Sequence, residues 1–142
     1  MIRPATIRDL DVLFELALKE CGRYPLRPDH QKIRSGIEMV ISERRHAALV
    51  VEREGQVVGA LLAATQDNLW AQRCSCQVLF WVCPVPGEGA EMLRRFLKWV
   101  RGRQTSIKVA GFMPDHDIDP RVWLLVERAG FKKHGGAYLL YT

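Results

Sequence analysis

The sequence predicts an α/β domain in which one mixed sheet of about seven strands is flanked by about four helices. Apolar residues at helical spacing predict the helices, and runs of β-branched residues predict the strands. The predicted order is strand, helix, helix, three strands, helix, strand, helix and two strands. No internal repeat, linker or low-complexity segment interrupts this order. A chain of 142 residues with 48% hydrophobic residues has enough apolar side chains for one core. We therefore expect residues 1–142 to form a single domain.

The N-terminal part predicts a short strand followed by two helices. Residues 2–6 are the strand candidate, and Thr6 with Asp9 three residues later has the spacing of a capping box that opens a helix. Gly22 is expected to end this helix. A second helix is predicted by apolar residues at helical spacing, namely Ile33, Ile37, Val40 and Ile41.

The middle of the chain predicts three strands. Residues 46–53 and 57–65 are rich in β-branched and aliphatic side chains, and Glu54 with Gly55 forms the turn of an antiparallel hairpin. A third apolar strand is expected at residues 75–83 after a polar loop.

The C-terminal part predicts a strand, a helix and a hairpin. The strand is expected at residues 106–113. Asp119 and Pro120 suit the N-cap and first position of a helix that ends at Gly130. Residues 131–142 are expected to form a final hairpin around two consecutive glycines.

A glycine turn, "VCPVPGEGAEML" at residues 82–93, joins the third apolar strand to a helix. Glycines there let the backbone approach a ligand, and the first N–H groups of the helix can face an anion such as a pyrophosphate. The alternative is that Gly87 and Gly89, beside Pro84 and Pro86, only make a tight turn. The helix after the turn is predicted by inward-facing Met92, Leu93, Phe96, Leu97 and Val100.

Charge and cysteine content exclude several classes of protein. The net charge of +5 suits an anionic ligand, a nucleic acid or an acidic protein equally, and no nucleic-acid reading motif accompanies it. Cys74 and Cys76 lack the second ligand pair of a structural zinc site, so we expect free thiols and no metal. No apolar stretch is long enough to cross a bilayer. Five basic residues follow the turn, namely Arg94, Arg95, Lys98, Arg101 and Arg103. Their spacing is typical of a solvated helix face, and the alternative is an anion site.

The element order, "IRPAT..DL" at the start, the glycine turn and "VERAGF" near the end resemble the GNAT superfamily of acetyl-CoA-dependent N-acetyltransferases, most closely its small bacterial and phage members. The resemblance covers nearly the whole chain. It implies the GNAT fold and direct acetyl transfer from acetyl-CoA to a primary amine of a small molecule or protein. By this resemblance, the pantetheine arm would lie between the fourth and fifth strands. The implied cofactor-binding residues are Trp81, Val82 and Cys83 for this arm and Gly87, Glu88, Gly89 and Ala90 for the pyrophosphate.

The resemblance also shows where this chain departs from the family. The position of the usual glutamate base on the fourth strand holds Gln77 or Val78, and that of the usual tyrosine acid holds Val126. His116, flanked by two aspartates, and Tyr138 on the final strand are candidate replacements. The alternatives are a polar capping loop around His116 and a structural role for Tyr138.

A second hypothesis is therefore a catalytically inactive GNAT-like protein that serves as a structural or binding component, for example of a phage particle. Its support is the missing acid and base, Pro84 in place of the family's Gln or Arg, and a turn shortened by a few residues. Either hypothesis allows a homo-oligomer or an assembly partner. The expected location is the cytoplasm, or the virion for a phage protein.

Overall fold

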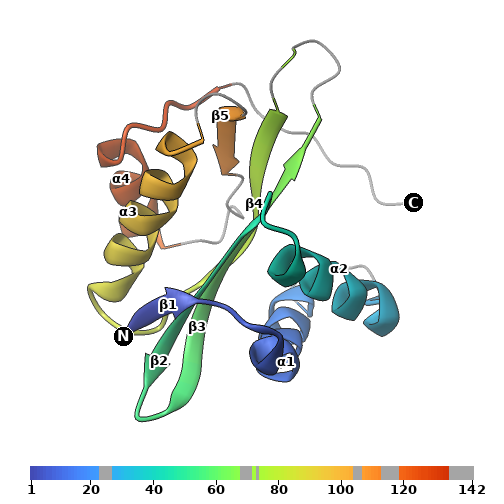
Figure 1. Ribbon diagram of the computed structural model, residues 1–142. Helices are drawn as coiled ribbons and strands as arrows, with labels where there is room; N and C mark the ends of the chain where they lie inside the picture. The colour runs from blue at the N-terminus through green and yellow to red at the C-terminus, as the bar shows by residue number, and fades with distance from the viewer. Residues whose placement is uncertain (23–26, 68–71, 73, 104–106, 113–118, 135–142) are drawn as a thin grey trace.

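The computed structural model describes residues 1–22, 27–67, 72, 74–103, 107–112 and 119–134. In these residues a single sheet separates two helical layers, with α1 and α2 on one face and α3 and α4 on the other (Figure 1). The elements in chain order are β1 (Ile2–Pro4), the 3₁₀ turn η1 (Ile7–Asp9), α1 (Leu10–Cys21), α2 (His30–Ser42), β2 (Ala47–Arg53), β3 (Gln56–Gln66), β4 (Cys74–Val82), α3 (Glu88–Arg101), β5 (Ile107–Phe112) and α4 (Pro120–Arg128).

The sheet follows chain order, β1-β2-β3-β4-β5, and every pairing is antiparallel except the parallel pair β4 and β5. The predicted hairpin is confirmed between β2 and β3. Its turn has positive φ angles of 50° at Glu54 and 77° at Gly55, which is the backbone that matches the right-handed twist of the two strands. This long twisted hairpin runs along the centre of Figure 1.

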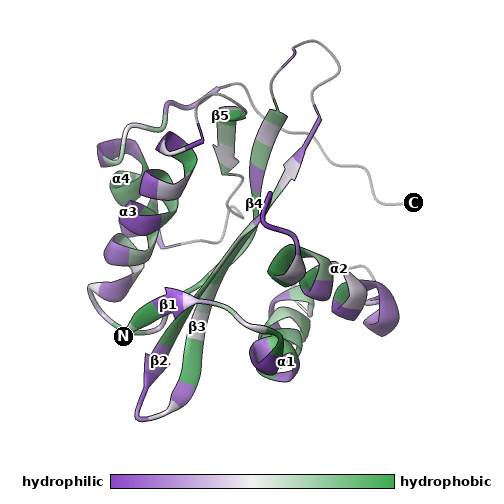
Figure 2. Cartoon of the chain, in the orientation of Figure 1, coloured by the Kyte–Doolittle hydropathy of each residue, from purple (hydrophilic) through white to green (hydrophobic). Residues whose placement is uncertain are grey.

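The layer of α1 and α2 is held by the aliphatic residues that the helical spacing predicts. Leu13 is fully buried, Ile37 and Val40 are nearly so, and all three pack against the face of the sheet that carries Val50 and Leu62. Figure 2 shows the same division by hydropathy, with polar residues turned outward on both helices and apolar residues along the central strands.

The capping box is confirmed, although it opens η1 rather than α1 directly. The backbone N–H of Thr6 donates to Asp9 Oδ2 at 2.7 Å, and the guanidinium of Arg3 donates to both oxygens of the Asp9 carboxylate at 2.8 and 2.9 Å. Arg3 Nε also donates to Glu52 Oε2 at 2.7 Å. This network ties β1, η1 and β2 together around Asp9, which is only 6% exposed.

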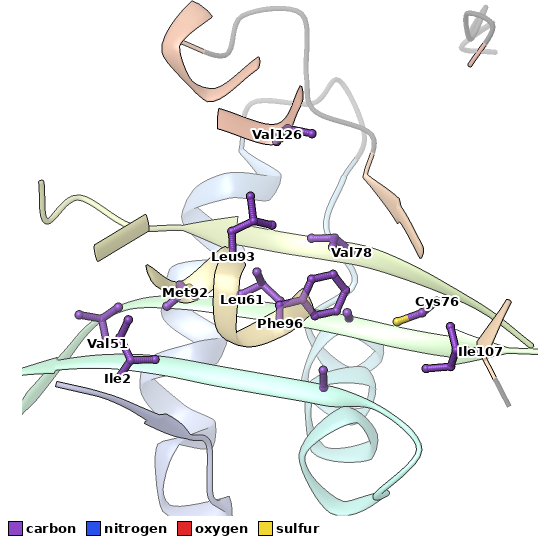
Figure 3. Close-up of a cluster of buried hydrophobic side chains, with 12 residues drawn as sticks. Ile2, Val51, Leu61, Cys76, Val78, Met92, Leu93, Phe96, Ile107 and Val126 are labelled. Carbon is purple, nitrogen blue, oxygen red and sulfur yellow. The ribbon is translucent and has the colours of Figure 1, made fainter. Parts of the chain in front are cut away.

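The other face of the sheet carries the larger core (Figure 3). Phe96 and Met92 of α3 are fully buried, and they lie over Leu61 of β3 and Val78 of β4, with Val126 of α4 above them. Asp119 caps α4 as predicted, because its Oδ1 accepts from the backbone N–H of Arg121 at 2.9 Å. The apolar faces expected for α3 and α4 therefore both face the sheet.

Five strands and four α-helices lie within the described residues, compared with the seven strands and four helices expected. The two further strands were expected at residues 131–142, and positions 135–142 lie outside the described residues. No helix in the described part of the chain is both long and apolar enough to cross a membrane.

Candidate cofactor site at the end of β4

The parallel strands β4 and β5 stay paired only over part of their length. Their ladder runs from Cys74 and Ile107 to Val78 and Phe112, where β5 ends, whereas β4 continues to Val82. Within the described residues, the last four positions of β4 therefore have no strand partner on this side. In the described part of the chain, their backbone groups therefore form a strand edge to which an extended ligand can hydrogen-bond.

A β-bulge changes the direction of β4 where it leaves β5. Leu62 of β3 pairs with Phe80 while the next residue, Ala63, pairs with Val78, so Leu79 is the extra residue and is 59% exposed. Because of the bulge, Phe80 packs with the α1 and α2 layer and Trp81 with the α3 and α4 layer. The bulge therefore turns the Trp81 side chain toward α3.

Gly59 of β3 allows the end of β4 to lie close to its neighbour. A Cβ at Gly59 would lie 2.6 Å from the carbonyl oxygen of Val82 and 3.2 Å from the Cα of Cys83. Only a residue without a side chain fits this close approach of two backbones. Gly59 thereby lets Val82 and Cys83, for which the GNAT resemblance implies a cofactor-binding role, lie close to β3.

The turn after β4 places the start of α3 beside this strand end. Gly87 is the N-cap residue with a positive φ of 81°, and no side chain caps the helix. The N–H of Glu88 donates to the carbonyl of Val85 at 3.2 Å. The N–H groups of Gly89 and Ala90 belong to the first turn of the helix, which has no preceding turn to supply carbonyl partners. These donors and the helix dipole suit an anion.

Glu88 does not leave an unbalanced negative charge at the turn. Its Oε1 forms a close ion pair with the guanidinium of Arg53, at the end of β2. The Glu88 side chain is 17% exposed, and its Oε2 atom is buried without a hydrogen-bond partner. Arg53 is half exposed and its charge is balanced by Glu88, so this ion pair adds no net positive charge at the start of α3.

A side chain at position 89 would point toward the protein rather than toward solvent. A Cβ at this position would lie 3.7 Å from Cys83 Cβ and 3.8 Å from Trp81 Cζ2, both ordinary van der Waals contacts. The Trp81 ring also meets the Phe112 ring edge to face, with 5.3 Å between the centroids. The indole thus lies between the start of α3 and the end of β5.

The two thiols nearest this region are not activated. Cys83 Sγ lies 3.7 Å from the carbonyl oxygen of Val85, and burial raises the pKa of this thiol. Burial also raises the pKa of Cys76, which is 1% exposed. A thiol with a raised pKa is a poor nucleophile at neutral pH.

The structure shows which layer is faced by each of the two β4 residues that the GNAT resemblance offered for the position of a base. Val78 is 8% exposed and packs in the core under α3, while Gln77 lies on the opposite face of β4, with its side-chain amide beside Gly111. Val126 is also buried in the core. None of these three side chains can transfer a proton at neutral pH. The candidate replacements His116 and Tyr138 lie outside the described residues.

The basic helix face after the turn is partly neutralised. Glu91 accepts from Arg95 Nε at 2.8 Å and from two nitrogens of Arg94, and these hydrogen bonds lower the pKa of the Glu91 carboxyl. Arg95 also donates to the backbone carbonyl of Ile2 at 2.6 Å. Arg94 and Arg95 therefore serve α3 and its contact with β1, which weakens their assignment to an anion site.

No protein-family model matches the sequence, and no curated protein matches it. Solved structures do. An aminoglycoside acetyltransferase from an uncultured soil metagenomic sample, in complex with sisomicin, superposes with a TM-score of 0.69 at 12% identity, covering 100% of this chain and 95% of that one. A second aminoglycoside acetyltransferase from such a sample gives a TM-score of 0.69 at 13% identity, covering 100% and 97%.

A third similar structure is described as a transcriptional regulator from Bacillus halodurans C-125, with a TM-score of 0.72 at 18% identity over 99% of both chains. The chain therefore has the fold of the GNAT acetyltransferases, as the sequence predicted. Because these identities are low, the comparison fixes the architecture and leaves the activity to be argued from the site.

Proposed function

We propose that this protein is an acetyltransferase that binds acetyl-CoA at the end of β4 and transfers the acetyl group to a primary amine. The observation that supports the proposal is the combination, at one place, of a β4 edge without a strand partner in the described residues and an uncapped helix N-terminus. The first suits the amide-containing pantetheine arm, and the second suits a diphosphate. The acceptor is a small-molecule amine, the substrate class indicated by the name of the sisomicin complex.

The chemistry is direct transfer. The neutral amine nitrogen attacks the thioester carbonyl carbon, a C–N bond forms, the C–S bond breaks, and CoA leaves as a thiolate that takes up the proton lost by the nitrogen. The described residues contribute by position: the β4 edge orients the thioester arm, and the first turn of α3 holds the phosphates. Gln77, Val78 and Val126 supply no proton transfer, so the base and acid roles rest on the candidates His116 and Tyr138.

The proposal is tested by a charge placed at the helix start. Ala90 is exposed in the first turn of α3. Ala90→Glu puts a carboxylate at a position where it stabilises a helix, yet it repels a diphosphate. Ala90→Gln is the matched neutral control. We expect calorimetric titration with acetyl-CoA to show binding to the wild type and to Ala90→Gln, and at least tenfold weaker binding to Ala90→Glu.

Turnover is then measured by mass spectrometry of a panel of amines, including aminoglycosides, because the partly exposed thiols of Cys21 and Cys74 would interfere with thiol reagents. Absence of acetyl-CoA binding to the wild type at millimolar concentration contradicts the proposal. Binding without any acetylated product supports the second candidate function, a non-catalytic GNAT-like binding component. The specific observation that favours this second candidate is the burial of Val78 and Val126 in the core.

A further inference from the structure

Most of the net positive charge belongs to the C-terminal part of the chain. Residues 1–87 carry 11 Lys or Arg and 10 Asp or Glu, whereas residues 88–142 carry 10 and 6. The second part supplies α3 and α4, the helical layer on one face of the sheet (Figure 1). The charge of this layer is therefore the electrostatic feature that sets it apart from the layer of α1 and α2.

Five exposed cations of this layer form no ion pair in the part of the chain that the structure describes. The acids nearby are already engaged, since Glu91 pairs with Arg94 and Arg95, and Glu88 pairs with Arg53. A further carboxylate caps α4 and pairs with the arginine two residues later. We call the five unpaired residues the cationic face: Lys98 and Arg101 of α3, Arg128 of α4, and Lys132 and Lys133 after it.

The cationic face looks away from the sheet. Leu93 and Phe96 of α3 and Val126 of α4 are buried in one core, so the opposite sides of both helices point to solvent. Phe131 packs on the same core, and its N–H donates to the carbonyl of Val126 at 3.2 Å, which holds the segment after α4 on this layer. Figure 2 shows hydrophilic residues along the outer sides of both helices.

The helix dipole explains only part of this charge. Lys98 and Arg101 stand in the last turn of α3 and Arg128 in that of α4, where a cation stabilises the helix end. Lys132 and Lys133 lie beyond Ala129, the C-cap of α4, and the dipole effect is confined to the last turn. Unpaired like charges on one surface also repel one another, and a bound polyanion removes this repulsion.

The composition of this surface favours nucleic acid over a protein or a bilayer. Nucleic-acid interfaces are strongly basic, whereas the centres of protein interfaces are depleted in Lys. A bilayer surface is bound by helices with a broad apolar face, but among the described residues α3 exposes no large apolar side chain and α4 exposes only Trp123 and Leu124. A single ring is enough for a base to stack on, and Trp123 is 39% exposed.

We propose that the cationic face binds nucleic acid through its phosphate backbone, without reading base sequence. Phosphate contacts need only correctly placed cations, which agrees with a sequence that contains no nucleic-acid reading motif. The inference goes beyond acetyl transfer and does not rest on it, because none of these residues belongs to the candidate cofactor site.

The test is fluorescence anisotropy of a fluorescein-labelled single strand of mixed sequence, titrated with protein at several salt concentrations. For four or five phosphate contacts, the wild type should show a slope of log K against log salt of about −3. The triple variant Lys98→Gln, Arg101→Gln and Arg128→Gln should bind at least about tenfold more weakly at low salt, with a slope shallower by about 2.

A matched variant separates this surface from net charge. Arg8→Gln, Lys32→Gln and Arg44→Gln remove three exposed cations from the N-terminal part of the chain, and should leave the slope unchanged. Should loss of the helix-end cations unfold the first variant, as its melting temperature would show, Lys132→Gln with Lys133→Gln removes two cations outside the helices. This double variant should weaken binding and make the slope shallower by about 1.

Four results would overturn the proposal. Equal losses in the two triple variants would mean that net charge alone attracts the strand. A wild type without saturable binding at low salt would rule out the surface as a nucleic-acid site. Displacement of the strand by phosphatidylserine vesicles at equal charge would assign the surface to a bilayer, and displacement by polyglutamate at equal charge would assign it to an acidic protein.

Discussion

Gly59→Ala is the substitution that tests most directly how the candidate site is built. The added methyl carbon would lie 2.6 Å from the carbonyl oxygen of Val82, well inside the ordinary contact distance of about 3.5 Å. The other atoms in contact are the Cα of Cys83 and the Cδ of Pro84. Because backbone atoms of β4 oppose the methyl group, no side-chain rotation can relieve the contact.

The expected magnitude follows from two opposing terms. Overpacking of this kind costs about 1–3 kcal/mol, and Ala gains about 0.5–1 kcal/mol over Gly within a strand because it loses less conformational entropy. The net destabilisation should be about 1–2 kcal/mol, which lowers the melting temperature of a chain of this size by roughly 3–6 °C. The displaced Val82 and Cys83 should also weaken acetyl-CoA binding.

Two further glycines provide controls. A Cβ at Gly36 in α2 meets nothing within 4 Å, so Gly36→Ala should stabilise the protein by up to about 1 kcal/mol through helix propensity. At Gly111 the obstructing atoms are the amide end of the Gln77 side chain, which can rotate away, so Gly111→Ala should be nearly neutral. Urea denaturation followed by circular dichroism measures all three. If Gly59→Ala is as stable as Gly111→Ala, the argument from backbone contact is wrong.

Three other predictions concern charge and burial. The guanidinium of Arg3 lowers the pKa of Asp9 to about 2, below the unfolded value of about 3.9. The ionised carboxylate therefore contributes about 1–2 kcal/mol of stability above pH 4. This contribution is lost as the pH falls toward 2. Urea denaturation of Asp9→Asn should show the loss at pH 7 and a smaller further loss in acid. Glu88→Gln removes a carboxylate and frees Arg53. Calorimetric titration should therefore show several-fold tighter acetyl-CoA binding at low salt and a smaller gain at high salt. Weaker binding would instead mean that the ion pair shapes the turn. Cys76 should react with iodoacetamide only on unfolding, as peptide mass spectrometry can follow, and rapid labelling of the native protein would contradict its burial.

The elements that the sequence predicted well are those fixed by local chemistry. The turn at Glu54 and Gly55 needs two positive φ angles, and the cap at Asp119 needs only the residues that follow it. Helical spacing likewise identified the buried faces of α1, α2 and α3. Such signals are contained within a few residues, so tertiary packing did not change them.

The features of the site that depend on distant segments were not predicted. The bulge at Leu79 arises from pairing with β3, and no local residue pattern marks it. The ion pair between Arg53 and Glu88 joins positions 35 residues apart. Gly59 did carry a usable signal, because an isolated glycine inside an apolar strand often marks a close backbone approach. The choice between Gln77 and Val78 also required the register of β4.

The site region is fixed from several directions before any ligand arrives. Gly59 holds the end of β4 from the side of β3, Phe112 holds the Trp81 ring, and Arg53 holds the first residue of α3 through Glu88. A ligand that binds here therefore loses little free energy to ordering of the protein. For the acetyl-CoA site that we propose, this rigidity predicts that affinity depends on the positions of Gly59 and Arg53 as much as on the glycines of the short turn with Pro84 and Pro86.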